Sequence, residues 1–183
     1  EARCRRTMID APVNIRGIKK FAVDQLAADK VAVPAPGVDT GRKIAVIGAG
    51  PSGLTCAYFL ALMGHNVTVF EEKKQAGGMM RYGIPAYRFP RARLDEDARA
   101  ICSLPNIEVR YEAHVGCEEM RAIAAAHDAV YVAIGAHIGK KLRLEGADAM
   151  GVSSAVDLLR GIGDGQIPDF TGKKVAVIGG GNV

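Results

Sequence analysis

The chain has 183 residues, of which 49% are hydrophobic and 24% are charged. This composition is typical of a folded globular protein and excludes general disorder. The 24 Lys and Arg residues against 20 Asp and Glu give a net charge of +4, which is too small to indicate a nucleic-acid-binding protein. The longest strongly apolar stretch, residues 54–63, is shorter than the roughly 20 residues of a membrane-spanning helix. The sequence therefore predicts neither nucleic acid nor membrane as a partner.

The cysteines and the two ends of the sequence suggest where the protein works and how much of it is present. Cys4, Cys56, Cys102 and Cys117 are far apart and include no Cys-x-x-Cys pair. This spacing indicates neither a disulfide framework nor a self-contained metal site, and it favours a reducing cytosol. The last three of these cysteines are predicted to be small apolar packing residues. Because the chain starts at a Glu and ends directly after a glycine-rich turn, we expect it to be a fragment of a larger protein.

Residues 1–39 are predicted to form a short helical section followed by a linker. The spacing of Ile18, Phe21 and Leu26 predicts a helix over residues 15–28. The Pro-containing run at 33–37 then breaks regular structure and indicates an extended linker.

Residues 42–70 are predicted to form a strand–helix–strand unit. The all-apolar run at 44–47 is typical of a parallel strand covered on both faces. A glycine-rich turn at 48–53 leads into a helix that Gly64 ends, and residues 66–70 form the next strand. Such a βαβ unit should have a right-handed crossover.

The remaining elements extend this pattern into an α/β fold with a Rossmann-like parallel sheet. We predict helices over 91–104, 118–126 and 152–160, and strands over 107–111, 129–134 (a buried strand) and 173–178. Segments 42–50 and 173–181 are identical at six of nine positions. The second segment therefore indicates the start of another dinucleotide-binding unit.

The glycine turn carries the main chemical signal. Gly48 permits a tight turn, Gly50 lets a pyrophosphate approach the backbone, and Gly53 lets the helix pack on the sheet. Free N–H groups and the positive end of the helix dipole then favour a diphosphate. This motif alone is weak, but here it follows an apolar strand and opens a helix.

An acidic residue at the end of the second strand strengthens this interpretation. Glu71 lies 71 − 53 = 18 residues after the last glycine of the motif, where a carboxylate accepts hydrogen bonds from ribose hydroxyls. Glu72 competes for this role, but Glu71 directly ends the strand. The three features together predict a bound dinucleotide.

The segment at 77–90 favours FAD over NAD as that dinucleotide. It contains several glycines and prolines where a simple NAD domain would continue into a helix. We predict an extended chain along a long ligand, with Gly77 and Gly78 allowing close approach; a surface loop is the alternative. The arginines of this region are predicted to be solvated, with a cofactor role considered only for Arg88: Arg81, Arg88, Arg91 and Arg93.

The glycine turn, the segments 77–90 and 131–136 and the second glycine start together resemble the glutamate synthase small-subunit family. That family includes the FAD/NADPH half of dihydropyrimidine dehydrogenase and the flavin subunits of ferredoxin-linked NADP transhydrogenases. The resemblance implies a remnant of an iron–sulfur helical domain plus linker at 1–39, an incomplete FAD-binding domain at 40–170, and the first strand and glycine turn of an NAD(P)H-binding domain at 171–183.

The resemblance also implies site residues. Val115 would contact the adenine end of FAD, and Ile134 with Gly135 would pass close to the cofactor. The full set implied to contact FAD is Gly48, Ala49, Gly50, Pro51, Ser52, Gly53, Glu71, Glu72, Gly77, Gly78, Met79, Arg88, Val115, Ile134 and Gly135. Cys4 resembles the last cysteine of an iron–sulfur cluster. Because a [4Fe–4S] cluster normally takes four thiolates, we expect no cluster in this chain.

The activity implied for the whole protein is electron transfer from NAD(P)H through FAD to iron–sulfur clusters and a partner subunit or ferredoxin. No side chain is predicted to be catalytic, and the four scattered histidines are interpreted as surface or structural residues. Two alternatives remain: a plain NAD-binding dehydrogenase domain, and a non-enzymatic flavin-binding electron-transfer or assembly subunit. A disulfide reductase is disfavoured because that chemistry needs a dithiol. The chain alone should bind a cofactor without turning over.

Overall fold

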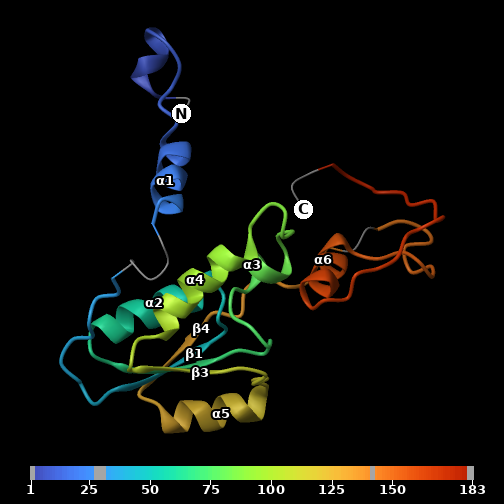
Figure 1. Cartoon of the computed structure of the whole chain (residues 1–183). Helices are drawn as coiled ribbons and strands as arrows, with labels where there is room; N and C mark the ends of the chain where they lie inside the picture. The colour runs from blue at the N-terminus through green and yellow to red at the C-terminus, as the bar shows by residue number, and fades with distance from the viewer. Residues whose placement is uncertain (1–2, 27–31, 141–142, 181–183) are drawn as a thin grey trace. The chain divides into compact units, whose positions relative to one another are not determined.

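The structure is a computed structural model that describes residues 3–26, 32–140 and 143–180. The chain divides into two units, Glu1–Val33 and Pro34–Val183, which are described separately (Figure 1).

The first unit holds two short helices, the 3-10 helix η1 (Arg5–Met8) and the α-helix α1 (Ile15–Asp24). The Asn14 side chain caps α1 by accepting a hydrogen bond from the Gly17 N–H at 2.9 Å, as expected of an N-cap asparagine. The predicted helix is confirmed through Asp24; residues 27 and 28, which the prediction included, lie outside the described residues. Neither helix contains a buried residue.

The second unit is built on a four-stranded parallel sheet, as the sequence predicts. Its strands are β1 (Lys43–Ile47), β2 (Asn66–Phe70), β3 (Ile107–Arg110) and β4 (Ala129–Val132), in the spatial order β3-β2-β1-β4. Every neighbouring pair is parallel. All four strands therefore end at the same edge of the sheet, which is where α/β folds bind their ligands.

Helices cover the sheet on its two faces (Figure 1). The helices α2 (Pro51–Leu62) and α4 (Arg91–Cys102) lie on one face, and α5 (Cys117–Ala126) lies on the other. Two further helices, α3 (Met79–Tyr82) and α6 (Ala155–Gly163), contact each other near the edge where the strands end.

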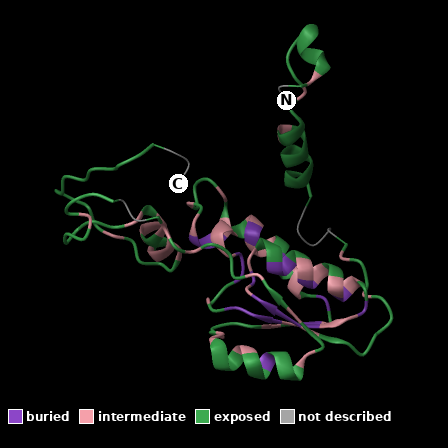
Figure 2. Ribbon diagram, turned by 180° about the vertical axis from the view of Figure 1, so that it is seen from behind, coloured by how far each residue is buried: buried purple, intermediate pink, exposed green. Residues whose placement is uncertain are grey.

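The core follows from the alternation of side chains along β1 and β2. Val46 and Val69 are completely buried, and Val46 lies against the start of α2 at Gly53. The intervening residues face α5, where Ala45, Ile47 and Phe70 cluster with Ile123. Figure 2 shows the buried residues gathered in the strands and in the helices packed on them. The prediction that β1 is covered on both faces is confirmed.

Two predicted strands differ from the structure. The strand at 129–134 was expected to be buried, but β4 ends at Val132 and forms an edge of the described sheet, so Tyr131 is 41% exposed. Residues 173–178 form no strand in the described part of the chain, and Val175, Val177 and Ile178 are exposed. An apolar run becomes a strand only where another strand accepts its backbone hydrogen bonds.

Helix boundaries shift where a cap decides them. The helix predicted over 152–160 is α6, which begins at Ala155 because the Ser154 side chain accepts a hydrogen bond from the Val156 N–H at 3.1 Å. The helices predicted over 91–104 and 118–126 are confirmed within two residues as α4 and α5.

Asp128 joins the starts of β1 and β4. Its Oδ2 accepts a hydrogen bond from the Lys43 N–H and its Oδ1 from Arg42 Nη1, each at 2.8 Å. The Asp128 N–H in turn donates to the Lys43 carbonyl oxygen at 2.8 Å. These donors, with the Lys43 N–H contributing most, lower the pKa of Asp128.

Replacing Asp128 should make the stability of the fold less dependent on pH in the acidic range. Because the folded-state pKa of Asp128 is lowered, its carboxylate stabilises the fold above the ordinary aspartate pKa of about 3.9, and this stabilisation is lost as the pH falls. Asp128→Asn should therefore lower the melting temperature at pH 7, and the difference from the unaltered chain should shrink towards pH 3. Thermal melts across this range test it, with Asp148→Asn, an exposed aspartate, as control. A constant difference at every pH would contradict the assignment.

Candidate functional site

In the turn between β1 and α2, contacts within the protein itself require glycine at two of the three motif positions. Gly48 has a φ of +103°, and a Cβ there would lie 2.5 Å from the Ala133 carbonyl oxygen. A Cβ on Gly53 would lie 1.8 Å from the Gly48 carbonyl oxygen. Both distances are far below van der Waals contact, so the two glycines are required by the packing of α2 and β4 against the turn.

Gly50 differs from these two glycines. Its φ is −75°, which any residue can adopt, and a Cβ there would approach nothing closer than the Gly78 Cα, at 3.6 Å. The protein's own contacts therefore leave space at this position. Packing therefore does not explain this glycine. A ligand that approaches the backbone closely would explain it, because a side chain here would block the approach.

The start of α2 is free to interact with an anion. Gly50 is its N-cap and offers no side-chain cap, Pro51 occupies its first turn, and no acidic residue lies there. The first N–H groups of a helix lack partners within it, and they lie at the positive end of its dipole. The Ser52 Oγ lies 3.0 Å from the Tyr131 hydroxyl of β4. The geometry fits a phosphate-bearing ligand.

The Glu71 carboxylate is held against this turn. It follows β2 directly and is 7% exposed, and its two oxygens accept hydrogen bonds from the Ala49 N–H at 2.6 Å and the Lys73 N–H at 2.8 Å. Because a carboxylate offers about four acceptor positions, both oxygens retain capacity for another donor. Glu72 instead is exposed, with its Oε1 3.8 Å from His114 Nδ1. Of the two acids, only Glu71 lies at the glycine turn.

A second pair of glycines packs directly on the first turn. The Gly77 N–H donates to the Ala49 carbonyl oxygen at 2.8 Å. Gly78 has a φ of +51°, and a Cβ there would lie 2.7 Å from the Gly50 Cα. The prediction of an extended chain after this pair is wrong at its beginning, because Gly78 serves as the N-cap of the one-turn helix α3.

The prediction that Arg81 is solvated is also wrong. Its side chain is 7% exposed, donates from Nε to the Ala76 carbonyl oxygen at 2.7 Å and forms an ion pair with Asp95 of α4. Arg81 therefore fixes the segment that carries the glycine pair to the helix beneath it. Burial of an arginine is stable when its donors are satisfied in this way.

Arg91 holds the other end of the same segment. At the start of α4, its Nη1 donates to the Met80 carbonyl oxygen and its Nη2 to that of Ile84, each at 2.7 Å. The Arg91 side chain is only partly exposed and both of its Nη atoms donate to backbone carbonyl oxygens, so it is not the solvated residue that the sequence predicts. Arg93 lies 2.7 Å from Glu96, whereas Arg88 is exposed.

Of the remaining predicted cofactor residues, those at the end of β4 lie beside the glycine turn. The Ala133 N–H donates to the Ile47 carbonyl oxygen at 2.8 Å, and a Cβ on Gly48 would lie 3.6 Å from the Ile134 Cα. Gly135 follows with a positive φ. Val115 is half-buried and packs against the α5-side core cluster.

The cysteines occupy different environments. Cys4 lies in the first unit, where backbone N–H groups, that of Val13 first, lower its pKa. Among the described residues, no group of three or more His, Cys, Asp or Glu could hold a metal ion. Burial raises the pKa of Cys56 and Cys102, as expected of packing residues, whereas Cys117 is exposed at the start of α5, contrary to its prediction.

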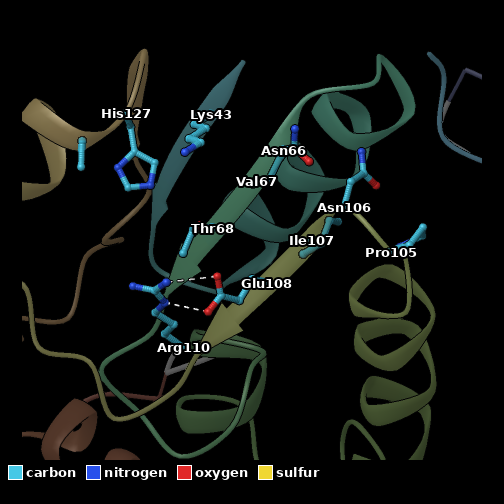
Figure 3. Close-up of a pocket in the computed structure, with 11 residues that line it drawn as sticks. Lys43, Asn66, Val67, Thr68, Pro105, Asn106, Ile107, Glu108, Arg110 and His127 are labelled. Atoms are coloured by element: carbon cyan, nitrogen blue, oxygen red, sulfur yellow. Dashed lines mark hydrogen bonds and ion pairs between the residues drawn. The ribbon is translucent and has the colours of Figure 1, made fainter. Parts of the chain in front are cut away.

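A cavity of about 540 Å³ lies away from this turn, along β2 and β3 on the face that α5 leaves open (Figure 3). Its lining includes Lys43, Asn66 and Thr68, and an ion pair in which both Glu108 oxygens accept from Arg110, at 2.8 and 3.1 Å. The lining contains no predicted cofactor residue. The cavity reflects the polar, uncovered half of the sheet, and the candidate site is the glycine turn.

Comparison with known proteins shows which proteins this chain is similar to. A family described as NAD(P)-binding Rossmann-like domain matches residues 46–113. Over its whole length the chain is 38% identical to the beta subunit of an NADP(+)-dependent formate dehydrogenase from Moorella thermoacetica, of which it spans 29%. It is 29% identical to a glutamate synthase [NADH] from Schizosaccharomyces pombe, of which it spans 9%. The chain is related to these oxidoreductases. The predicted resemblance is confirmed, and the chain spans less than a third of both relatives.

A solved structure supports the fold. FprA from Mycobacterium tuberculosis, determined in complex with NADPH, matches 66% of this chain and 28% of its own with a TM-score of 0.60 and 23% identity. This similarity confirms the Rossmann-like α/β architecture.

Among the helices of the described residues, none has the length and apolar character that a membrane span needs.

Removing the Arg91 side chain should loosen the segment that carries the second glycine pair. Arg91→Ala leaves the Met80 and Ile84 carbonyl oxygens without their donors, which should cost about 1–3 kcal/mol of unfolding free energy. Urea unfolding measures this change. Arg121→Ala, at an exposed position of α5, should change it by less than about 0.5 kcal/mol. Equal effects of the two substitutions would contradict the role of Arg91.

Proposed function

We propose that the glycine turn binds the diphosphate of FAD in an NAD(P)H-dependent flavin oxidoreductase. The observation that carries this proposal is the meeting of three backbone segments at the glycine turn: the turn itself, the pair Gly77–Gly78, which contacts Ala49 and Gly50, and the end of β4, which lies against Gly48. The fold leaves the position beside Gly50 open, at the positive end of α2.

The proposed contacts follow from this arrangement. N–H groups at the start of α2 bind the diphosphate, and Glu71 accepts hydrogen bonds from the adenosine ribose in addition to those from the Ala49 and Lys73 N–H groups. The glycine pair and Met79 run beside the cofactor, with Arg88, Val115, Ile134 and Gly135 as further contacts.

The second glycine pair favours FAD over a nicotinamide dinucleotide at this turn. Its backbone contacts the first turn directly, so a ligand bound at Gly50 would also meet Gly78. This supports a cofactor that extends past the diphosphate along residues 77–90.

The proposed reaction of the whole protein moves two electrons as a hydride from NAD(P)H and passes them singly to iron–sulfur clusters and a partner subunit or ferredoxin. The flavin supplies the redox chemistry when bound, and residues of this chain bind and orient it. NAD(P)H as the reductant is supported by the relatives, which include a subunit of an NADP(+)-dependent formate dehydrogenase and a glutamate synthase [NADH]. A [4Fe–4S] cluster that uses Cys4, the domain divisions at 39 and 170, and the cytosolic location are parts of the same proposal.

A plain NAD(P)-binding domain is the second candidate, because the family that matches residues 46–113 is one of NAD(P)-binding Rossmann-like domains. Purified protein separates the two: flavin absorbance near 450 nm, a general property of this cofactor, supports the proposal, whereas a colourless protein that binds NADH contradicts it. If the whole protein were instead a non-enzymatic electron-transfer or assembly subunit, it should reduce no dye with NAD(P)H in the absence of a partner.

Substituting Gly50 should separate ligand binding from folding. Gly50→Ala places a Cβ where the protein has room and the proposed diphosphate does not, so it should keep the melting temperature within a few degrees while FAD binding is weakened. The larger side chain of Gly50→Val should abolish FAD binding more completely. Melting curves and the quenching of FAD fluorescence measure the two effects.

Two other glycines are the controls for this test. Gly53→Ala should unfold the domain, because its Cβ would meet the Gly48 carbonyl oxygen at 1.8 Å, and Gly161→Ala in α6 should change neither property. If Gly50→Ala unfolds the chain, or binds FAD unchanged, the ligand role of Gly50 is wrong.

The acid after β2 provides an independent test. Glu71→Ala should weaken FAD binding by about 1–3 kcal/mol, the range for charge-assisted hydrogen bonds, and Glu72→Ala should weaken it less because that side chain lies away from the turn. Titration with FAD measures both, with Glu118→Ala in α5 as control. A larger loss in the Glu72 variant would assign the ribose to Glu72.

A further inference from the structure

The hydroxyl groups of Ser52 and Tyr131 meet at the start of α2. Ser52 lies in the first turn of that helix and Tyr131 lies on β4, 79 residues further along the chain, yet their oxygens are 3.0 Å apart. Both residues are exposed, so the pair lies at the surface where a ligand at the glycine turn would bind. Strand pairing fixes this meeting, because Tyr131 is in register with Val46 of β1.

The hydrogen bond leaves one hydroxyl proton unused. Each hydroxyl donates once and can accept twice, and in a bond between two hydroxyls only one proton is consumed. The phenol is the more acidic group, so it is the better donor, which leaves the Ser52 proton free to point outward. A hydroxyl that already accepts a hydrogen bond is also a stronger donor, because hydrogen bonds in a chain polarise one another.

The electrostatic setting selects an anion as the acceptor of that proton. The start of α2 carries no acidic residue and no side-chain cap, and its dipole adds positive potential. A phosphate oxygen at this place would accept from the helix N–H groups and from Ser52 together.

We propose that Tyr131 is a positioning residue for the dinucleotide: its hydroxyl donates to the Ser52 Oγ and orients the Ser52 proton towards a phosphate oxygen. This inference rests on the proposed function and adds a residue that the sequence motif does not contain. Tyr131 itself need not touch the ligand.

A double-mutant cycle tests the pair. FAD and ADP carry the diphosphate and adenosine lacks it, so Tyr131→Phe and Ser52→Ala should each weaken FAD and ADP binding about three- to tenfold, the effect of one hydrogen bond, and leave adenosine binding unchanged. The double variant should be no weaker than Ser52→Ala alone, because Tyr131 acts through Ser52. Ser52→Thr, which keeps the hydroxyl, should bind as the unaltered chain does.

Tyr58→Phe is the matched control. Tyr58 lies six residues after Ser52 in α2 and its ring packs against Phe59, so this variant loses a tyrosine hydroxyl away from the start of the helix and should bind FAD unchanged. Equal FAD affinity of Tyr131→Phe and the unaltered chain would overturn this inference alone, as would losses that multiply in the double variant. Failure of the unaltered chain to bind FAD or ADP would overturn the proposed function as well.

Discussion

The close approach of two backbone segments at Gly48 and Gly53 is the constraint on which the candidate site depends. With no side chain on Gly53, α2 starts directly over the end of β1. This places the positive end of a twelve-residue helix at the edge of the sheet where all four parallel strands end. Any larger residue at Gly53 would push the helix away, and its free N–H groups would no longer converge with the ends of β2 and β4.

Ala49 organises the groups around that turn. It is completely buried, its N–H donates to Glu71 and its carbonyl oxygen accepts from Gly77. One peptide segment thus fixes both the acid and the second glycine pair. Lys73 extends the connection, since its N–H donates to Glu71 while its Nζ lies 2.8 Å from Asp164, just after α6. The segment that leads out of α6 is therefore tied to the loop that holds the acid.

How much of this arrangement the sequence predicts depends on the range of the interactions involved. The strands β1 and β2 and the turn between β1 and α2 could be predicted, because an apolar run, a glycine spacing and a helix stop are local signals. The roles of Arg81 and Arg91 could not, because their partners are carbonyl oxygens and a carboxylate that only the folded chain brings near. An arginine in a polar segment gives no local sign of burial.

The same distinction explains the strands that differ. The pattern at 129–134 and at 173–178 is apolar in both cases, but burial and pairing depend on which strands lie alongside. In the described chain β4 has a neighbour on one side only, and residues 173–178 have none. Hydrophobic pattern predicts that a segment can be a strand, and the topology decides whether it is one.

The three glycines of the motif carry different kinds of information once their surroundings are known. Gly48 and Gly53 are explained by contacts within the protein, so their presence supports the fold and says little about a ligand. Gly50 has ordinary backbone angles and open space, so the fold gives no reason for a glycine there. A residue that the fold does not require, at a place where helix N–H groups and the backbone of Gly78 meet, is best explained by something that binds. The proposed dinucleotide site therefore depends on Gly50, the one glycine of the motif that folding could replace.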